Sequence, residues 1–212
     1  MLTKAFNKIN FQEEREEFFM SYLNGQVGYR EELLDTRTIV KKDNYVVLEP
    51  DGLVKNVVPG YEGCDVTILG SPAMGADFAD YLVTVHEGGK NTGIGGEGIE
   101  SFLYVIEGEV SVKNDEKSAD LTAGGYIYSP AGNNITFTSK GSADAKLYVY
   151  RRRYTALEGY KAYTVINNVN DMEYMEYEGM TNCHSKDLLP SAKDLGFDVD
   201  KQVNPNGGAI AL

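Results

Sequence analysis

The chain has 212 residues, and 20 lysines and arginines stand against 32 aspartates and glutamates, giving a formal net charge of −12. Hydrophobic residues make up 42% and charged residues 25%, values that argue against a disordered chain. Binding of a phosphate backbone requires clustered lysine and arginine, so the acidic balance disfavours a nucleic-acid-binding protein. The basic run Arg151-Arg152-Arg153 ends an apolar alternation, and we interpret it as a strand end with solvated guanidinium groups.

The first twenty residues differ in character from the rest of the chain. Apolar residues recur at roughly helical spacing within residues 1–20 and just beyond, which indicates an amphipathic helix, a frayed arm, or an extension upstream of a true start at Met20. The same region contains the run EEREE at residues 13–17 and lacks the apolar centre of a secretory signal. No apolar run approaches the length of a membrane span. We therefore expect a cytoplasmic protein with no membrane partner.

Residues 44–150 change to short β-rich runs divided by Gly, Pro, Asn and Asp. Turn signals recur about every 8 to 12 residues, a pattern typical of an all-β sandwich or barrel. With 23 glycines, 15 tyrosines and no long helical period, a jelly-roll β-barrel fits best. At residues 50–52, proline presets φ and glycine accepts a positive φ, which predicts a turn. Strands are expected at residues 45–48, 54–58, 66–69, 81–85, 102–106, 110–112, 126–128, 135–137 and 147–150.

After Arg153 the chain has the character of a connector. Residues 163–166 could form one more strand, and residues 167–171 are typical of a turn. Residues 188–190 and 194–197 look like the entry to another domain, but the sequence ends about fifteen residues later without a strand pattern.

Two segments have the spacings of two sequence motifs that occur as a pair. In the later one, Gly124, Pro130 and Gly132 have the gaps of G-x5-P-x-G-x2-H-x3-N, with Ile135 at the histidine position and Ser139 at the asparagine position. This spacing resembles the second motif of the cupins. Imidazole and carboxylate groups on alternate residues of adjacent strands would face inward there and suit Mn, Fe, Ni or Zn.

The first cupin motif, G-x5-H-x-H-x3/4-E-x6-G, closes at Gly108, which places Ser101 at the glutamate position. The two permitted spacings put its histidine positions at Ile94 and Gly96, or at Gly95 and Glu97. The turns that shape a cupin barrel are therefore present, whereas every metal ligand is replaced. We expect no metal, cofactor or catalytic residue in this barrel.

Other candidate residues are isolated. His86 ends a β-run and is interpreted as a surface or core residue, the alternative being a metal site shared with Glu97 and Glu100. The glycine-rich loop at residues 93–98 lacks a helix N-terminus to hold a phosphate, so we interpret it as a flexible loop at the barrel mouth. His184 adjoins Cys183, and adjacent residues cannot both bind one tetrahedral ion without further partners.

The two histidines exclude a convincing Ser-His-Asp or Cys-His set. The two cysteines, Cys64 and Cys183, cannot build a disulfide framework and have no C-x-x-C spacing, so we expect reduced thiols.

Six segments, spread over residues 22–199, closely resemble the bacterial (S)-ureidoglycine aminohydrolases. They are YREELL at 29–34, PDGLVKN at 50–56, GGEGIESFLYVI at 95–106, YRRRY at 150–154, YEGM at 177–180 and LLP at 188–190. The resemblance implies a bicupin of the allantoin branch of purine breakdown. Such an enzyme is Mn-dependent and hydrolyses ureidoglycine to ureidoglycolate with release of ammonia, the cation acting as a Lewis acid.

The resemblance also implies that the metal ligands lie in the second cupin, in a Glu-x-His-x3-His segment with a later Gln. No such segment occurs here, so no catalytic residue is carried over, and Mn²⁺ is expected only for the full-length family. From Asp200 onward the resemblance stops, as a shifted reading frame would produce. The expected organisation is an extension at 1–20, an N-terminal cupin barrel at 21–155, and a connector with the truncated start of a second cupin at 156–212.

Three hypotheses follow. The first is a truncated aminohydrolase that is inactive alone and acts on a small ureide only if the second cupin is supplied. The second is a binding or assembly module whose tyrosine-lined barrel holds a small molecule without metal. The third is one half of a split enzyme. Without a second domain, Leu188, Leu189, Leu195 and Phe197 should be exposed or mispacked, which predicts self-association into a homo-oligomer.

Overall fold

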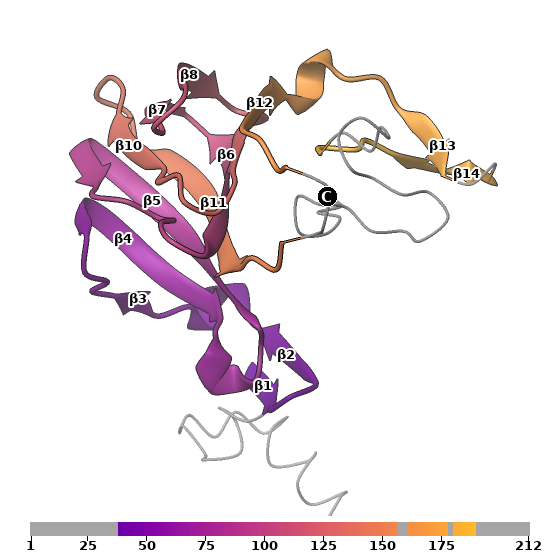
Figure 1. The fold of residues 1–212 in the computed structure, drawn as a ribbon. Helices are drawn as coiled ribbons and strands as arrows, with labels where there is room; N and C mark the ends of the chain where they lie inside the picture. Colours follow the sequence, from indigo (N-terminus) through magenta and orange to yellow (C-terminus); the bar gives the residue numbers. More distant parts are fainter. Residues whose placement is uncertain (1–37, 157–160, 178–179, 190–212) are drawn as a thin grey trace, which may run out of the picture.

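The computed structural model describes residues 38–156, 161–177 and 180–189, and strands dominate this part of the chain (Figure 1). The predicted extension at 1–20 lies outside the described residues. Within them, no helix is long and apolar enough to cross a membrane. A small antiparallel hairpin, β1 (Thr38–Lys41) with β2 (Tyr45–Leu48), stands apart from the main sheet, and Asp43 adopts a φ of 61° in its turn.

The main sheet follows the order β12-β9-β6-β11-β5-β10-β7-β8, with β4 added beside β5 and β3 beside β4. A third sheet is the hairpin of β13 and β14, which projects away from the barrel in Figure 1. The bounds are β3 (Lys55–Asn56), β4 (Tyr61–Gly70), β5 (Phe78–Asn91), β6 (Ile99–Glu107), β7 (Glu109–Lys113), β8 (Ser118–Thr122), β9 (Gly125–Ser129), β10 (Thr136–Ser139), β11 (Ala145–Arg153), β12 (Val165–Asn168), β13 (Met175–Tyr177) and β14 (Met180–Ser185).

The long strand β5 joins the two layers of the barrel. Its first part pairs with β11, from Phe78 to Val85, and its last part meets β10 at Lys90. Strand β4 runs beside both parts, with a register shift between Glu62 and Cys64. Such a bulge bends a strand, and Gly63 permits it with a φ of 60° where a Cβ would lie 3.1 Å from the Gly89 Cα. The predicted all-β jelly-roll cupin barrel is therefore confirmed.

Every second residue of the barrel strands points into the barrel interior. Successive side chains of a strand point to opposite faces, so the alternate residues of β5, β6, β9 and β11 form one aliphatic core. Its fully buried members include Val66, Val83, Val85, Leu103, Val105, Val110, Ile127, Ile135, Ala145, Leu147 and Val149.

The intervening residues of these strands point outward and form a second, aromatic cluster on the outer face of the sheet. Phe102, Tyr126 and Tyr128 are buried in it, and Leu188 and Leu189 cover it at 2% and 5% exposure. The Tyr126 hydroxyl donates a hydrogen bond to the Leu188 carbonyl at 2.6 Å. The expectation that Leu188 and Leu189 are exposed is therefore wrong, because they pack on this face. Leu195 and Phe197 lie outside the described residues.

The expected tyrosine-lined barrel is also wrong. Tyr81 is buried in the inner core and Tyr61 packs against it. Most described tyrosines of the barrel strands lie instead on the outer face, namely Tyr104, Tyr126, Tyr128, Tyr148 and Tyr150. The interior is filled by aliphatic side chains rather than by a ring of phenols.

Local differences from the predictions have physical reasons. Residues 50–52 form a short 3-10 helix (Pro50–Gly52) begun by proline, but Gly52 is not among the glycines with positive φ. The strand expected at 54–58 shrinks to Lys55–Asn56, because Val54 and Val57 are exposed. The strand expected at 163–166 begins at Val165, and the predicted turn contains another short 3-10 helix, Val169–Asp171.

Candidate functional site

The two cupin motifs meet inside the barrel as their spacing predicts. The Ile94 amide donates to the Ile135 carbonyl at 3.0 Å, and both side chains are buried in the core at 2% and 0% exposure. Ser101 is 1% exposed, and its Oγ would lie 2.8 Å from a Cβ on Gly95. With the first histidine position at Ile94, the four ligand positions of the two motifs thus hold two isoleucines, one glycine (Gly96) and one serine.

This donor set does not fit a divalent metal. Isoleucine side chains supply no ligand, and a lone neutral hydroxyl is no substitute for imidazole and carboxylate. Among the described residues, no group of three or more His, Cys, Asp and Glu could hold a metal ion. The Ser101 hydroxyl also has no hydrogen-bond partner. We derive no chemical step through a metal in this barrel.

The glycine-rich loop at the barrel mouth is tied down by hydrogen bonds. Gly96 accepts from the amides of Gly132, at 2.9 Å, and Ile99, at 3.1 Å. The Gly95 amide donates to Asn134 Oδ1 at 2.9 Å, and the Tyr154 amide donates to the Gly98 carbonyl at 3.0 Å. These contacts join the first motif, the second motif and the end of β11 into one rim.

Glu100 belongs to β6 rather than to this loop, and its side chain is buried. Its carboxylate meets two partners on neighbouring strands: Arg152 Nε lies 3.3 Å from Oε1, and the Tyr128 hydroxyl donates to Oε2 at 2.9 Å. The strand register sets Arg152 directly opposite Glu100. Burial raises the pKa of Glu100 to about 7, against the lowering effects of Tyr128 and Arg152. The interpretation of Arg152 as a solvated guanidinium is therefore wrong.

The alternative metal site of His86, Glu97 and Glu100 is not assembled. His86 is on the outer surface, where Nε2 lies 3.2 Å from Asp65 Oδ2 and Nδ1 lies 3.1 Å from Asp144 Oδ1. Glu97 is exposed and Glu100 is buried beside Arg152. The carboxylates of Asp144 and Asp65 raise the pKa of His86, so the histidine serves in a surface ion pair.

Cys64 supplies no reactive thiolate. Burial raises the pKa of the free thiol Cys64 to about 11, so the thiolate is scarce at neutral pH. Cys183 and His184 belong to β14, with His184 edge-on to the Tyr174 ring at 6.5 Å.

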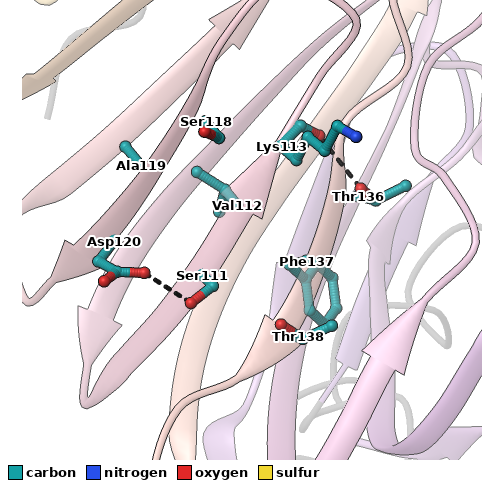
Figure 2. Close-up of a pocket in the computed structure, with 9 residues that line it drawn as sticks. All are labelled: Ser111, Val112, Lys113, Ser118, Ala119, Asp120, Thr136, Phe137 and Thr138. Carbon is teal, nitrogen blue, oxygen red and sulfur yellow. Dashed lines mark hydrogen bonds between the residues drawn. The ribbon is translucent and has the colours of Figure 1, made fainter.

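Figure 2 shows a groove on the outside of β7, β8 and β10 with a volume of about 440 Å³. In it the Ser111 hydroxyl donates to Asp120 Oδ1 at 2.6 Å, and Lys140 neutralises the same carboxylate at 2.6 Å. The Thr136 hydroxyl donates to the Lys113 carbonyl. The hydroxyls of Ser111 and Thr136 are thus satisfied by neighbours. The carboxylate beside the serine is a weak base, because its hydrogen bonds with Lys140 and Ser111 lower the pKa of Asp120.

Comparison with known proteins identifies the family. The chain is 49% identical over 185 residues to (S)-ureidoglycine aminohydrolase of Escherichia coli strain K12, covering 87% of this chain and 70% of that protein. The chain belongs to the (S)-ureidoglycine aminohydrolase family. A model of the EutQ-like cupin domain matches residues 75–154.

More distant relatives agree. The (S)-ureidoglycine aminohydrolase of Arabidopsis thaliana is 26% identical over 77% of the chain, which spans 54% of that protein. The probable enzyme of Oryza sativa subsp. japonica is also 26% identical, and the chain spans 52% of it. The chain therefore spans about half the length of these plant members of the family.

Solved structures support the fold. The crystal structure of the protein Ylba from E. coli matches with a TM-score of 0.68 and 46% identity, over 79% of this chain and 66% of that one. A putative glyoxylate-induced protein of Pseudomonas aeruginosa has a TM-score of 0.60 at 17% identity, over 66% of this chain and 54% of that one, a likeness of fold alone.

The sequence did not reveal one polar cluster of the structure, which consists of Glu100, Arg152 and Tyr128. Their spacing held a usable signal, because Glu100 lies two residues before Phe102, and Arg152 two residues after Tyr150, on the same outward alternation. What the sequence could not supply was the strand register that sets Arg152 opposite Glu100 and brings Tyr128 to the same carboxylate.

Proposed function

We propose that this chain is the non-catalytic barrel region of an (S)-ureidoglycine aminohydrolase, a Mn²⁺-dependent enzyme of allantoin breakdown that converts ureidoglycine to ureidoglycolate and ammonia. One observation carries the proposal: the motif positions that bind metal in a cupin hold Ser101, Ile135 and either Ile94 with Gly96 or Gly95 with Glu97, so none of them is a histidine. In this proposal the metal and the substrate-contacting groups lie in a second cupin, in the part of the E. coli relative that the chain does not span.

The chemistry of the reaction supports this division. Loss of ammonia from the chiral carbon requires stabilisation of developing charge and proton transfer at the leaving amine. The interior offers the Ser101 hydroxyl with no partner, and of the described histidines His184 is exposed and His86 is half-buried between Asp65 and Asp144. A nucleophile without a base, inside an aliphatic core, does not perform acid–base catalysis.

The structure supports a scaffolding role for the outer face. The aromatic cluster binds Val165, Leu188 and Leu189, so it anchors the segment that follows the barrel. The Tyr126 hydroxyl fixes that segment through the Leu188 carbonyl. The barrel can thus hold the following chain in a defined place relative to its own strands.

The proposal includes a cytoplasmic homo-oligomer with a small ureide as its partner, and without nucleic acid or membrane partners. The net charge of −12 is consistent with a small-molecule enzyme rather than a phosphate-backbone binder.

The test is an ammonia-release assay on freshly generated ureidoglycine with Mn²⁺, with the E. coli relative as the positive control. We expect the 212-residue chain alone to release ammonia no faster than the non-enzymatic reaction and to retain less than stoichiometric Mn²⁺ after gel filtration. Adding a separately expressed second cupin of the E. coli relative tests the split-enzyme alternative, which predicts recovered turnover. Turnover by the chain alone with Mn²⁺ would overturn the proposal.

A further inference from the structure

An open cavity of about 700 Å³ lies at the end of the barrel where β5 begins and β11 ends. Two of its walls, Ala79 and Ile94, belong to the inner core, so the cavity is a mouth of the barrel. Gly95 also lines it, with the unpartnered Ser101 hydroxyl directly behind. The cavity therefore adjoins Ile94 and Gly95 of the first cupin motif, and its volume suits a small molecule.

The charge of this cavity is opposite to that of the protein. Three arginines, Arg151, Arg152 and Arg153, line it against one acidic residue, Asp77, whereas the whole chain carries a net charge of −12. In a chain where carboxylates outnumber basic groups, a concentration of guanidinium groups around one concave site favours binding of an external anion.

The three arginines have different partners. Arg152 is committed to the buried Glu100 carboxylate. The guanidinium of Arg151 lies 5.5 Å from the centre of the Tyr81 ring, which holds it in place without neutralising it. Among the described residues, neither Arg151 nor Arg153 forms an ion pair. Side chains two apart on a strand share a face, so these two guanidinium groups point to the same side of β11.

The other walls limit the kind of anion. Ile94, Ile99 and Phe78 present an apolar surface, which suits an organic ligand. Asp77 places a negative charge on the same cavity, which opposes a compact dianion such as phosphate and can accept a hydrogen bond from an N–H group of the ligand.

We propose that this barrel mouth is a binding site for a small organic monocarboxylate, with the carboxylate held by Arg151 and Arg153 and the rest of the ligand against Ile94, Ile99 and Asp77. Guanidinium groups bind carboxylates through paired N–H donors, which gives the site its selectivity. The inference is independent of the proposed function, because it requires binding by this chain alone and no turnover.

The experiment is isothermal titration calorimetry of the whole chain at constant ionic strength with three probes. The probes are N-carbamoylglycine as the carboxylate, its neutral amide, and inorganic phosphate. We expect saturable binding of the carboxylate with about one site per chain, and at least about tenfold weaker binding of the amide and of phosphate. Phosphate binding equal to carboxylate binding would overturn the assignment to a carboxylate, and equal binding of the amide would overturn the role of the arginines.

Variants locate the site. Arg151→Gln and Arg153→Gln should each weaken carboxylate binding by about tenfold or more. Lys146→Gln, on the same strand but paired with Glu107 at the other end, is the matched control and should leave binding unchanged. Thermal melting of each variant shows whether it is folded. Unchanged affinity in folded Arg151→Gln and Arg153→Gln, or no saturable binding by the parent chain, would overturn the proposal.

Discussion

The inner and outer faces of the main sheet carry different kinds of side chain, although the same strands supply both. In the middle of the inner face of β6, β9 and β11, the alternate residues are aliphatic: Leu103, Val105, Ile127, Leu147 and Val149. On the outer face the intervening residues are aromatic or charged: Glu100, Phe102, Tyr104, Tyr126, Tyr128, Tyr148, Tyr150 and Arg152. The middle of the barrel interior is therefore aliphatic packing, whereas the buried Glu100 carboxylate and its partners Tyr128 and Arg152 lie on the outer face.

The difference explains how a cupin barrel persists without a metal. A metal-bearing interior must keep imidazole and carboxylate groups that cost free energy to bury unless they are paired. Replacing them with Ile94 and Ile135 converts that part of the interior into ordinary apolar packing. The Ser101 hydroxyl at that point has no hydrogen-bond partner. The buried Asn91 side chain donates to the Ile135 carbonyl and accepts from the Phe137 amide.

The largest expected effect on stability comes from a cavity made in the aliphatic core of the inner face. Leu147→Ala removes a side chain with 0% exposure from the aliphatic core and should lower the free energy of unfolding by about 2–5 kcal/mol. Urea unfolding followed by fluorescence measures the change. Val47→Ala on the exposed hairpin is the control and should change stability by no more than about 0.5 kcal/mol. Equal effects of the two variants would contradict the assignment of Leu147 to a packed core.

The next effect tests the buried carboxylate of the outer face. Because the pKa of Glu100 in the folded chain is raised to about 7 from 4.5, the folded state holds its proton more tightly than the unfolded state does. The folded protein should therefore lose stability as pH rises from about 4.5 through about 7, by about 3 kcal/mol from this group, and the loss should level off once the pH is above the folded pKa. Glu100→Gln removes the titration and should abolish this part of the pH dependence.

Urea unfolding at pH 5 and pH 7.5 measures the difference between parent and variant. Only the difference is informative, because Asp80 also has a raised pKa through burial and would contribute the same slope to both proteins. Glu107→Gln, an exposed residue of the same strand, should keep the parent's pH dependence. A Glu100→Gln variant with the parent's full slope would show that Arg152 and Tyr128 keep the carboxylate ionised at acidic pH.

A smaller effect tests whether the outer face anchors the segment after the barrel. Tyr126→Phe removes the hydrogen bond to the Leu188 carbonyl while keeping the ring, and should cost about 0.5–1.5 kcal/mol. Amide hydrogen exchange should increase within residues 180–189 more than in β6 or β11. Tyr45→Phe, on the exposed hairpin, serves as the control. Exchange that rises evenly over the whole barrel would contradict a local anchoring role.

The contrast also shows which features a sequence can reveal. The spacing of Gly124 and Gly132 was sufficient for the motif, because both glycines adopt a positive φ, 87° and 97°, that few other residues accept. Strand β8 was missed, because Leu121 is its one buried residue and the alternation is too weak to detect. The Glu100–Arg152–Tyr128 cluster was missed because its members lie far apart in sequence and meet only through the register of three strands.

The smallest expected effect concerns a charged pair at the surface, where water screens the charges. His86 is in contact with Asp144 and Asp65, in that order of influence, and both raise its pKa above the ordinary value of 6.5. The two carboxylates favour the protonated His86 ring. Any stabilisation of the folded chain by this pair is therefore present below the ordinary pKa and is lost as pH rises through the raised pKa of the folded state. An NMR titration, with the His86 signal assigned by His184→Gln, should show a midpoint above 6.5 that falls in Asp144→Asn. A midpoint unchanged by Asp144→Asn would mean that solvent screens this pair, whereas the midpoint of Glu100, enclosed on the outer face, should depend strongly on its neighbours.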